Sequence, residues 1–258
     1  MSQRKKLGLA LGAGSARGFA HIGALQVLRE HNISIDVVTG CSMGALIGAL
    51  YVTGCDIYFL EKYAINFNLS HYLDFSLVNK GFVKGNKIVE LLKILTKNKR
   101  IEEADIPFCC VAIDVSTGEL KVFDKGPLYQ AVRASISIPG VFVPYEIDGN
   151  YYIDGGMLER LPVGAARDLG ADVVLGIDVS YHGEKMPVPK HTLGTMQNTM
   201  NIMGWEIARH RIYKSDILVI PDVYHIDPNS TKDAQLCIQR GREAMLKKVD
   251  QVKEMVEG

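Results

Sequence analysis

The chain of 258 residues is predicted to form a three-layer α/β/α fold around a mostly parallel central sheet. Short apolar runs rich in β-branched residues recur along it and alternate with stretches of helical periodicity. Continuous apolar runs of this kind are typical of strands that helices cover on both faces. No internal repeat or domain boundary interrupts the pattern, and the length suffices for one large core, so we expect a single domain over residues 1–258.

The expected elements follow from these patterns. The strands are apolar runs bounded by turn residues, and they cover residues 6–11, 35–39, 108–114, 172–178 and 217–220. The helices repeat apolar residues at spacings of three and four, and they cover residues 19–30, a stretch from 43, 86–97, 126–135, 159–169, 192–213 and 232–256. The last of these is expected to pack as one amphipathic helix.

The first strand runs into a glycine-rich loop, Gly12-x-Gly14-x-x-x-Gly18, and then into a helix. Such a loop presents free backbone N–H groups, which a dinucleotide pyrophosphate, a nucleotide phosphate or a tetrahedral oxyanion could use. The spacing departs from the G-x-G-x-x-G fingerprint, and no Gly-Lys-Ser/Thr follows. The pattern therefore favours an oxyanion site over the two phosphate sites, with a purely structural loop as the plain alternative.

The second strand ends in Gly40-x-Ser42-x-Gly44, and an Ala/Leu-rich helical stretch begins at once. A strand, a sharp turn and a helix are the context in which a serine becomes an exposed nucleophile. The two glycines allow the tight turn, and the helix N-terminus favours negative charge developing nearby. The plain alternative is a tight turn with an incidental serine.

A third feature is the hairpin signal Asp148-Gly149, whose second strand closes with Asp154 before two glycines. The glycines leave this carboxylate room to point at a partner, although Asp-Gly-Gly is by itself more typical of a turn. Asp114 and Asp178 also end apolar strands and are rival bases. His225 follows the last strand, where a Ser-Asp-His triad of the α/β-hydrolase order would place its histidine.

Two stretches are rich in large apolar residues. Aromatic residues crowd residues 55–85, which indicates either a satellite core or a lid and acyl-pocket wall within an excursion over 55–100. Met196, Met200, Met203 and Trp205 have helical spacing, which favours ordinary core packing.

Composition gives no case for nucleic acid or an anionic surface, because Lys+Arg and Asp+Glu both number 29. No run approaches the length of a transmembrane helix, and the basic N-terminus is a poor signal peptide, so we expect a cytoplasmic protein. Five cysteines without metal-type spacing are expected to be reduced thiols, and the Cys41 side chain is expected to point away from Ser42.

Together these motifs resemble the patatin-like phospholipase family, in particular its compact bacterial members. The resemblance covers roughly residues 6–180, including Arg133-Ala134-Ser135 and the prolines that follow. It implies a patatin-like domain with a Ser42–Asp154 dyad, in which Ser42 is the nucleophile and Asp154 its base. It also implies an oxyanion hole formed by the amides of Gly12, Gly14, Ser15 and Met43, with Arg17 nearby. Gly40 and Gly44 would form the nucleophile elbow. Ala13 stands where many relatives carry glycine, which matters only if that position needs a positive φ.

The resemblance implies a serine hydrolase of lipid acyl esters, of the phospholipase A, lysophospholipase or esterase type, without metal or cofactor. Its partners would be the lipid or another acyl ester and, transiently, a membrane surface, but no nucleic acid. Two alternatives stay open: an α/β-hydrolase-type esterase with a triad through His225, and a nucleotide- or acyl-phosphate-binding regulator without hydrolase activity. The lipid class, positional preference and oligomeric state are left open.

Overall fold

The computed structural model describes residues 4–67, 83–180, 182–183, 188–189, 192–209 and 214–257. Within these residues the strands form one mixed sheet in the order β5-β6-β3-β2-β1-β7-β8, and β4 also pairs with β3. The strands are β1 (Leu7–Leu11), β2 (Val37–Cys41), β3 (Phe108–Asp114), β4 (Leu120–Phe123), β5 (Tyr145–Ile147), β6 (Asn150–Asp154), β7 (Val173–Ile177) and β8 (Ile217–Val219). The central strands β3, β2, β1, β7 and β8 run parallel, whereas β4, β5 and β6 pair in antiparallel fashion.

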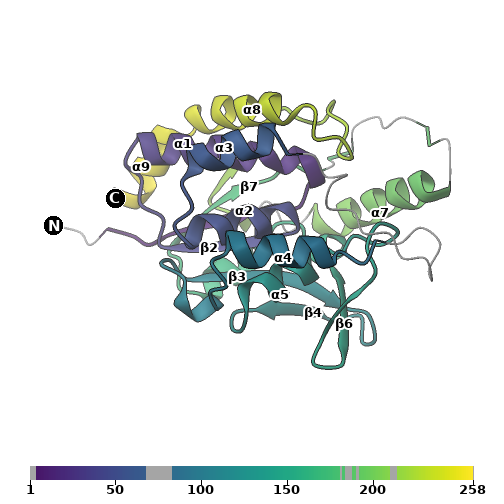
Figure 1. Ribbon diagram of the computed structural model, residues 1–258. Coiled ribbons are helices and arrows are strands. Elements are labelled where there is room, and N and C mark those ends of the chain that lie inside the picture. The colour runs from purple at the N-terminus through teal and green to yellow at the C-terminus, as the bar shows by residue number, and fades with distance from the viewer. Residues whose placement is uncertain are drawn as a thin grey trace.

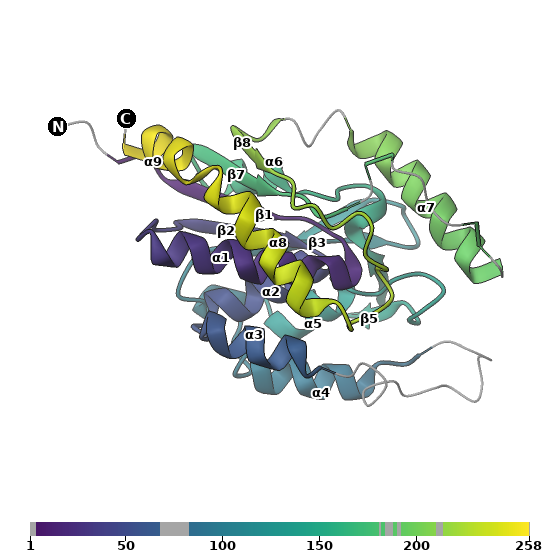
Figure 2. The same cartoon turned by 90° about the horizontal axis from the view of Figure 1, so that it is seen from above.

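Helices lie on both faces of this sheet (Figure 1). The α-helices are α1 (Ala20–Glu30), α2 (Met43–Val52), α3 (Ile57–Ile65), α4 (Asn86–Leu95), α5 (Leu128–Ser135), α6 (Val163–Asp168), α7 (Thr192–Ala208), α8 (Ala234–Leu246) and α9 (Val249–Glu257). The short 3-10 helices are η1 (Ser15–Phe19), η3 (Ile101–Glu103) and η4 (Gly155–Met157). Figure 2 shows α8 lying along α1, and both views show α7 projecting from one side of the molecule.

Strand β1 explains how the two faces differ. Leu7, Leu9 and Leu11 point to the face covered by α1, α2 and α8 and belong to the large core. Ala10 points to the other face, where α6 packs in a smaller cluster. Because the side-chain direction alternates along a strand, one apolar run supplies both layers. The predicted three-layer α/β/α class is confirmed.

The expected strands all occur, and the turn at Asp148 and Gly149 joins β5 to β6 with positive φ at both residues, 50° and 82°. Three expectations need correction. Strand β4 was not predicted, because its side chains are mostly exposed and its apolar pattern is weak. The helix expected over 232–256 is two helices, α8 and α9, although its apolar spacing does mark the buried residues. Helix α3 was not predicted in the aromatic stretch 55–85, whose Phe75 and Phe82 lie outside the described residues, whereas α4 matches the helix expected over 86–97.

Candidate active site

Ser42 occupies a sharp turn between β2 and α2. Its φ of 54° lies in the left-handed region, which is costly for a residue with a side chain and is typical of functional turns. A Cβ on Gly44 would come within 2.1 Å of the Leu11 carbonyl oxygen, and one on Gly40 within 2.5 Å of the Ala45 Cα. The two predicted elbow glycines are therefore required by close backbone packing around Ser42.

Strand β3 brings the two ends of the predicted dyad together. Cys41, the last residue of β2, pairs with Val111, and Asp154, the last residue of β6, pairs with Ala112. Because β4 occupies the other edge of β3, β2 and β6 approach each other along the same edge and end head to head. Ser42, which follows Cys41 directly, thus lies beside Asp154 although 112 positions separate them in the sequence.

The Asp154 carboxyl group is buried, and its surroundings shift its protonation. Burial raises its pKa to about 6, because a charged group is poorly solvated there. Hydrogen bonding by the Ser42 side chain opposes this increase, as does the N–H of Gly156, 2.8 Å from Oδ1. The Sγ of Cys41 lies 3.8 Å from the same oxygen, so this thiol contacts the dyad through Asp154. A carboxyl group with such a pKa is suited to exchange protons near neutral pH.

Ser135 holds the backbone of the elbow, a role that the sequence did not indicate. Its hydroxyl accepts the N–H of Ser42 at 2.9 Å and donates to the Val111 carbonyl at 2.7 Å. Both contacts are fully buried, so the hydroxyl links α5, β3 and the strained turn. The only sequence signal was the position of Ser135 in the block that resembles the family.

The glycine loop next to Ser42 offers fewer free amides than predicted. The N–H of Gly12 donates to the Ile177 carbonyl at 2.9 Å, and the N–H of Arg17 donates to the Gly14 carbonyl at 3.1 Å. Within the described part of the chain, the N–H groups of Gly14 and Ser15 meet no acceptor. The predicted set of oxyanion donors narrows to these two amides and that of Met43, which as the first residue of α2 has no partner within its helix.

The residue of the glycine loop that has a positive φ is Ser15 and not Ala13, the position at which the sequence departs from the family. Ser15 has a φ of 50°, whereas Ala13 is not among the residues with positive φ. The Ala13 side chain therefore costs no backbone strain, and its N–H donates to the Arg160 carbonyl at 2.9 Å. The strained residue of the loop, Ser15, lines both cavities at Ser42, whereas Ala13 lines one of them.

Arg17 connects the glycine loop to the segment after β8. Its guanidinium donates to the carbonyl oxygens of Tyr224 and Ile226, the latter at 2.9 Å. It therefore anchors the segment that carries Pro228 and Asn229, which line the cavities at Ser42. This contact holds the loop in place through backbone oxygens.

Two cavities meet at Ser42. The polar cavity, of about 160 Å³, reaches from the glycine loop to α7 and includes Asp154. The apolar cavity, of about 220 Å³, lies between α2, α3 and α4. The residues that line both are Ser15, Ser42, Ile138, Pro228 and Asn229. A molecule attached at Ser42 would therefore have an apolar space on one side and a polar space on the other.

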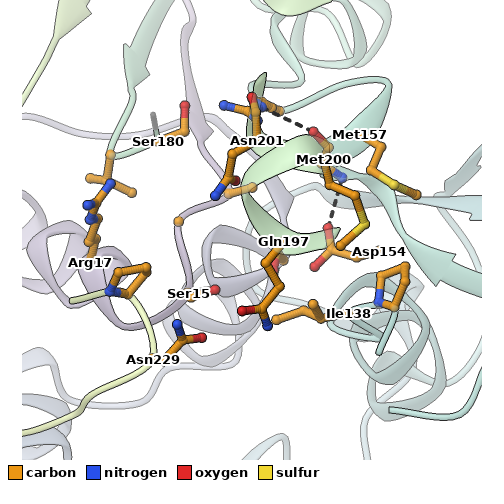
Figure 3. A pocket seen from close by; sticks show the side chains of 18 of the residues that line it. Ser15, Arg17, Ile138, Asp154, Met157, Ser180, Gln197, Met200, Asn201 and Asn229 are labelled. Carbon is orange, nitrogen blue, oxygen red and sulfur yellow. Dashed lines mark hydrogen bonds between the residues drawn. The ribbon is translucent and has the colours of Figure 1, made fainter. Parts of the chain in front are cut away.

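The polar cavity is rich in side-chain amides. Figure 3 shows the amides of Gln197 and Asn229 turned toward one another beside Ser15. Asn198 and Asn201 of α7 line the same space. Side-chain amides both donate and accept hydrogen bonds, so this lining suits a polar group of mixed character.

Helix α7 is placed differently from what its spacing predicted. Met196 and Met203 are 51% and 59% exposed, so the prediction that these methionines pack in the core is wrong. Met200 lines the polar cavity, and Trp205 packs against the small cluster under α6. The four residues therefore lie in different surroundings, and only Met196 and Met203 are open to solvent.

The rival residues lie in other surroundings. Asp114, the last residue of β3, accepts the N–H of Ser116 at 2.8 Å in the connection to β4. Asp178 is fully buried, with one oxygen 3.2 Å from Nε2 of His182. His225 pairs with Asp222 at 3.7 Å, is substantially exposed and lines neither cavity at Ser42. None of these three side chains lines a cavity at Ser42.

His21 of α1 has a structural setting. It is fully buried, and its Nε2 lies 2.8 Å from the Gly12 carbonyl. Burial lowers its pKa to about 4, so the ring is neutral at physiological pH and Nε2 donates this bond. The His21 ring therefore holds the glycine loop in place through its hydrogen bond to Gly12.

Comparison with known proteins gives the same family as the motifs. A family model described as patatin-like phospholipase matches residues 9–167. The chain is 36% identical over 181 residues to an uncharacterized NTE family protein of Mycobacterium tuberculosis, covering 69% of this chain and 50% of that protein. It is 33% identical over 189 residues to lysophospholipase NTE1 of Coccidioides immitis, covering 71% of this chain and 12% of that protein. The chain thus spans half the length or less of these relatives.

Two solved structures are similar in fold. VipD from Legionella pneumophila has a TM-score of 0.66 at 14% identity, over 97% of this chain and 67% of VipD. The type III effector protein ExoU has a TM-score of 0.55 at 13% identity, over 97% of this chain and 54% of ExoU. At these identities the likeness concerns the fold alone. Because the family model matches more than half of its residues, the chain belongs to the patatin-like phospholipase family.

Proposed function

We propose that the protein hydrolyses carboxylic esters of lipids with Ser42 as nucleophile and Asp154 as general base. One observation carries the proposal: Ser42 lies in a strained turn where the two cavities meet, beside a buried carboxyl group whose pKa is raised to about 6. A general base is most effective when its pKa lies near the working pH. The family membership of the chain supports the same chemistry.

The proposed reaction has two stages. Asp154 takes the hydroxyl proton while Oγ of Ser42 bonds to the ester carbonyl carbon, and the amides of Gly14, Ser15 and Met43 hold the oxyanion. The bond to the leaving alcohol then breaks, the alcohol takes the proton from Asp154, and the acyl group stays on Ser42. Water next loses a proton to Asp154 and attacks the acyl carbon, after which that proton returns to Ser42 Oγ as the fatty acid leaves.

We infer that the substrate is a lipid ester with one acyl chain, such as a lysophospholipid. The apolar cavity provides space for one chain, and the polar cavity on the other side of Ser42 suits the leaving group. Relatives that share about a third of their aligned residues with this chain are named lysophospholipases, which supports this substrate class.

Contact with a lipid surface is part of the proposal. Within the described residues, no helix is both long and apolar enough to cross a membrane. The outer face of α7 instead exposes large apolar side chains next to the polar cavity: Met196, Ile202, Met203 and Ile207. We propose that this face touches the lipid surface transiently while the substrate enters, at the gain expected for partial burial of apolar area.

The dyad is tested by comparing three purified variants on a soluble butyrate ester. Ser42→Ala and Asp154→Asn should each lower kcat by about 10³-fold or more, because members of a nucleophilic unit act together. His225→Ala is the matched control and should keep most of the activity, since its side chain lies outside both cavities. Full activity of Ser42→Ala would refute the proposal, and loss of activity only in His225→Ala and Ser42→Ala would replace the dyad by a triad.

A further inference from the structure

The apolar cavity follows one face of α2 away from Ser42. The α2 residues that line it are spaced three and four apart and therefore share a face of the helix: Met43, Leu46, Ile47 and Leu50. The opposite wall comes from the inner faces of α3 and α4, namely Leu60, Tyr63, Ala64, Ile88, Leu91, Leu92 and Leu95. An acyl chain bonded to Ser42 has this lined space directly in front of it.

Contacts at the helix ends show which residues lie far from Ser42. Lys97, just after α4, donates to the Thr53 carbonyl at the C-terminal end of α2, at 2.9 Å. Helix α4 therefore runs in the same direction as α2, and Leu95 lies near its far end. Thr231 donates to the Phe67 carbonyl beyond the C-terminus of α3, at 3.2 Å, on the side of the cavity mouth. Helix α3 thus runs the other way, and Leu60 lies deep in the cavity.

Buried leucine side chains line the part of the apolar cavity that lies away from Ser42. Leu50 and Leu60 are 3% and 2% exposed, and Leu92 of α4, which lines the same cavity, is 1% exposed. The upper part of the wall is held by Arg133, which is fully buried and donates to the Lys84 carbonyl at 2.9 Å, one residue before the N-cap of α4. The space therefore has a wall fixed near its mouth and a floor of leucine side chains.

The length of this space follows from α2. An α-helix rises about 1.5 Å per residue, so the eight steps from Ser42 to Leu50 span about 12 Å. Carbon–carbon bonds of about 1.5 Å advance an extended chain by somewhat less than their length, so about ten carbons fill that distance. Longer chains would meet the Leu50 and Leu60 side chains.

We propose that the apolar cavity measures the acyl chain, with Leu50 and Leu60 as the floor that sets an optimum of about ten carbons. This inference rests on the proposed ester hydrolysis at Ser42. It assigns chain selection to the interior wall formed by α2, α3 and α4. Phe67 contributes to the mouth of the cavity, so the aromatic segment is only part of the selecting surface.

The test is a series of p-nitrophenyl esters from acetate to palmitate, each at a concentration below aggregation. The value of kcat/KM should rise by up to about fourfold per methylene group while the chain is being buried, and then fall beyond about ten carbons. The Leu50→Ala variant should move the optimum toward longer chains by about two carbons, and Leu50→Phe should move it toward shorter chains. Leu60→Ala is a second variant that should act like Leu50→Ala.

The control is Leu28→Ala, a buried leucine of α1 that does not line the cavity. It should lose stability like the other alanine variants and keep the wild-type optimum, because ratios between esters cancel the folded fraction. If the optimal chain length is unchanged in all Leu50 and Leu60 variants while hydrolysis still depends on Ser42, this inference alone is overturned. Absence of any Ser42-dependent hydrolysis would refute the proposed function and this inference with it.

Discussion

The edge of the sheet at Ser42 and the helices that wall the two cavities are built on different principles. At the edge, backbone touches backbone: Gly40, Gly44 and Gly155 have no room for a Cβ, and Ser42 is held in a strained conformation. Around the cavities, side chains of α2, α3, α4 and α7 form the surface. We therefore expect the geometry of the proposed reaction to depend on the main chain of the sheet, and its selectivity to depend on side chains that can be exchanged.

The largest effect is expected from adding a methyl group at the edge. The new Cβ of Gly44→Ala would meet backbone oxygen at 2.1 Å, so we expect a loss of more than about 4 kcal/mol in unfolding free energy or failure to fold. The control is Gly164→Ala in α6, where no atom lies within 4 Å and the helix should gain about 0.5–1 kcal/mol. Urea unfolding measures both, and a folded, stable Gly44→Ala protein would break the contrast.

A pH dependence is expected from Asp154. Burial raises its pKa from 3.8 to about 6, so the folded protein binds this proton more tightly than the unfolded chain does. The stability that the protonated carboxyl contributes is therefore complete below about pH 4 and is lost as the pH rises through about 6, by about 3 kcal/mol at most. Asp154→Asn should not show this fall in urea unfolding between pH 4 and pH 7.

Activity should depend on the deprotonated form of Asp154 and therefore increase over the pH range in which stability decreases. A general base must be deprotonated, so kcat/KM for a soluble ester should rise with pH through an apparent pKa of about 6. A profile that is flat from pH 5 to pH 8 would contradict the assigned role of Asp154.

Ser135 offers a smaller and more selective test. Replacing it by Ala removes the acceptor of the Ser42 N–H, and a misplacement of the elbow should lower kcat by about 10- to 100-fold with KM little changed. Ser137→Ala is the matched control, because its equally buried hydroxyl bonds to Arg133. Both variants should lose similar stability, whereas only Ser135→Ala should react slowly with a fluorophosphonate. Equal loss of reactivity in both would mean that Ser135 acts on the fold alone.

The smallest effect is expected on the outer face of α7. Met203→Ala should change the unfolding free energy by no more than about 0.5 kcal/mol, because the side chain is mostly exposed. Met245→Ala in α8 removes a fully buried methionine and should cost about 2–5 kcal/mol. If Met203→Ala were as costly, this face would be core, as its spacing alone suggested.

The same contrast explains how far sequence reasoning could go. The apolar runs and the motifs around Ser42 and Asp154 are local signals. They predicted the strands of the sheet and the proximity of Ser42 to Asp154. The partner of the Gly12 amide is a carbonyl of β7, far along the chain, and a local pattern carries no information about it. Ser135 was missed for the same reason.

The packing of the helices that line the cavities was harder to predict from the sequence. Periodicity identifies an apolar face but not what covers it, so α7 was predicted to pack in the core although Met196 and Met203 are exposed. Helix α3 was not predicted, because aromatic residues at partly exposed positions, such as Phe59, obscure its apolar periodicity. Only tertiary packing decides which apolar face is buried, lines a cavity or meets solvent.

The central claim is that Ser42 is a nucleophile activated by Asp154. The most direct measurement is labelling of the native protein with a fluorophosphonate at pH 8, followed by mass mapping of the modified peptide. We expect one adduct, on Ser42, with a labelling rate that falls as the pH drops through about 6 and is nearly lost in Asp154→Asn. An unmodified Ser42, or labelling as fast in Asp154→Asn as in the wild type, would contradict it.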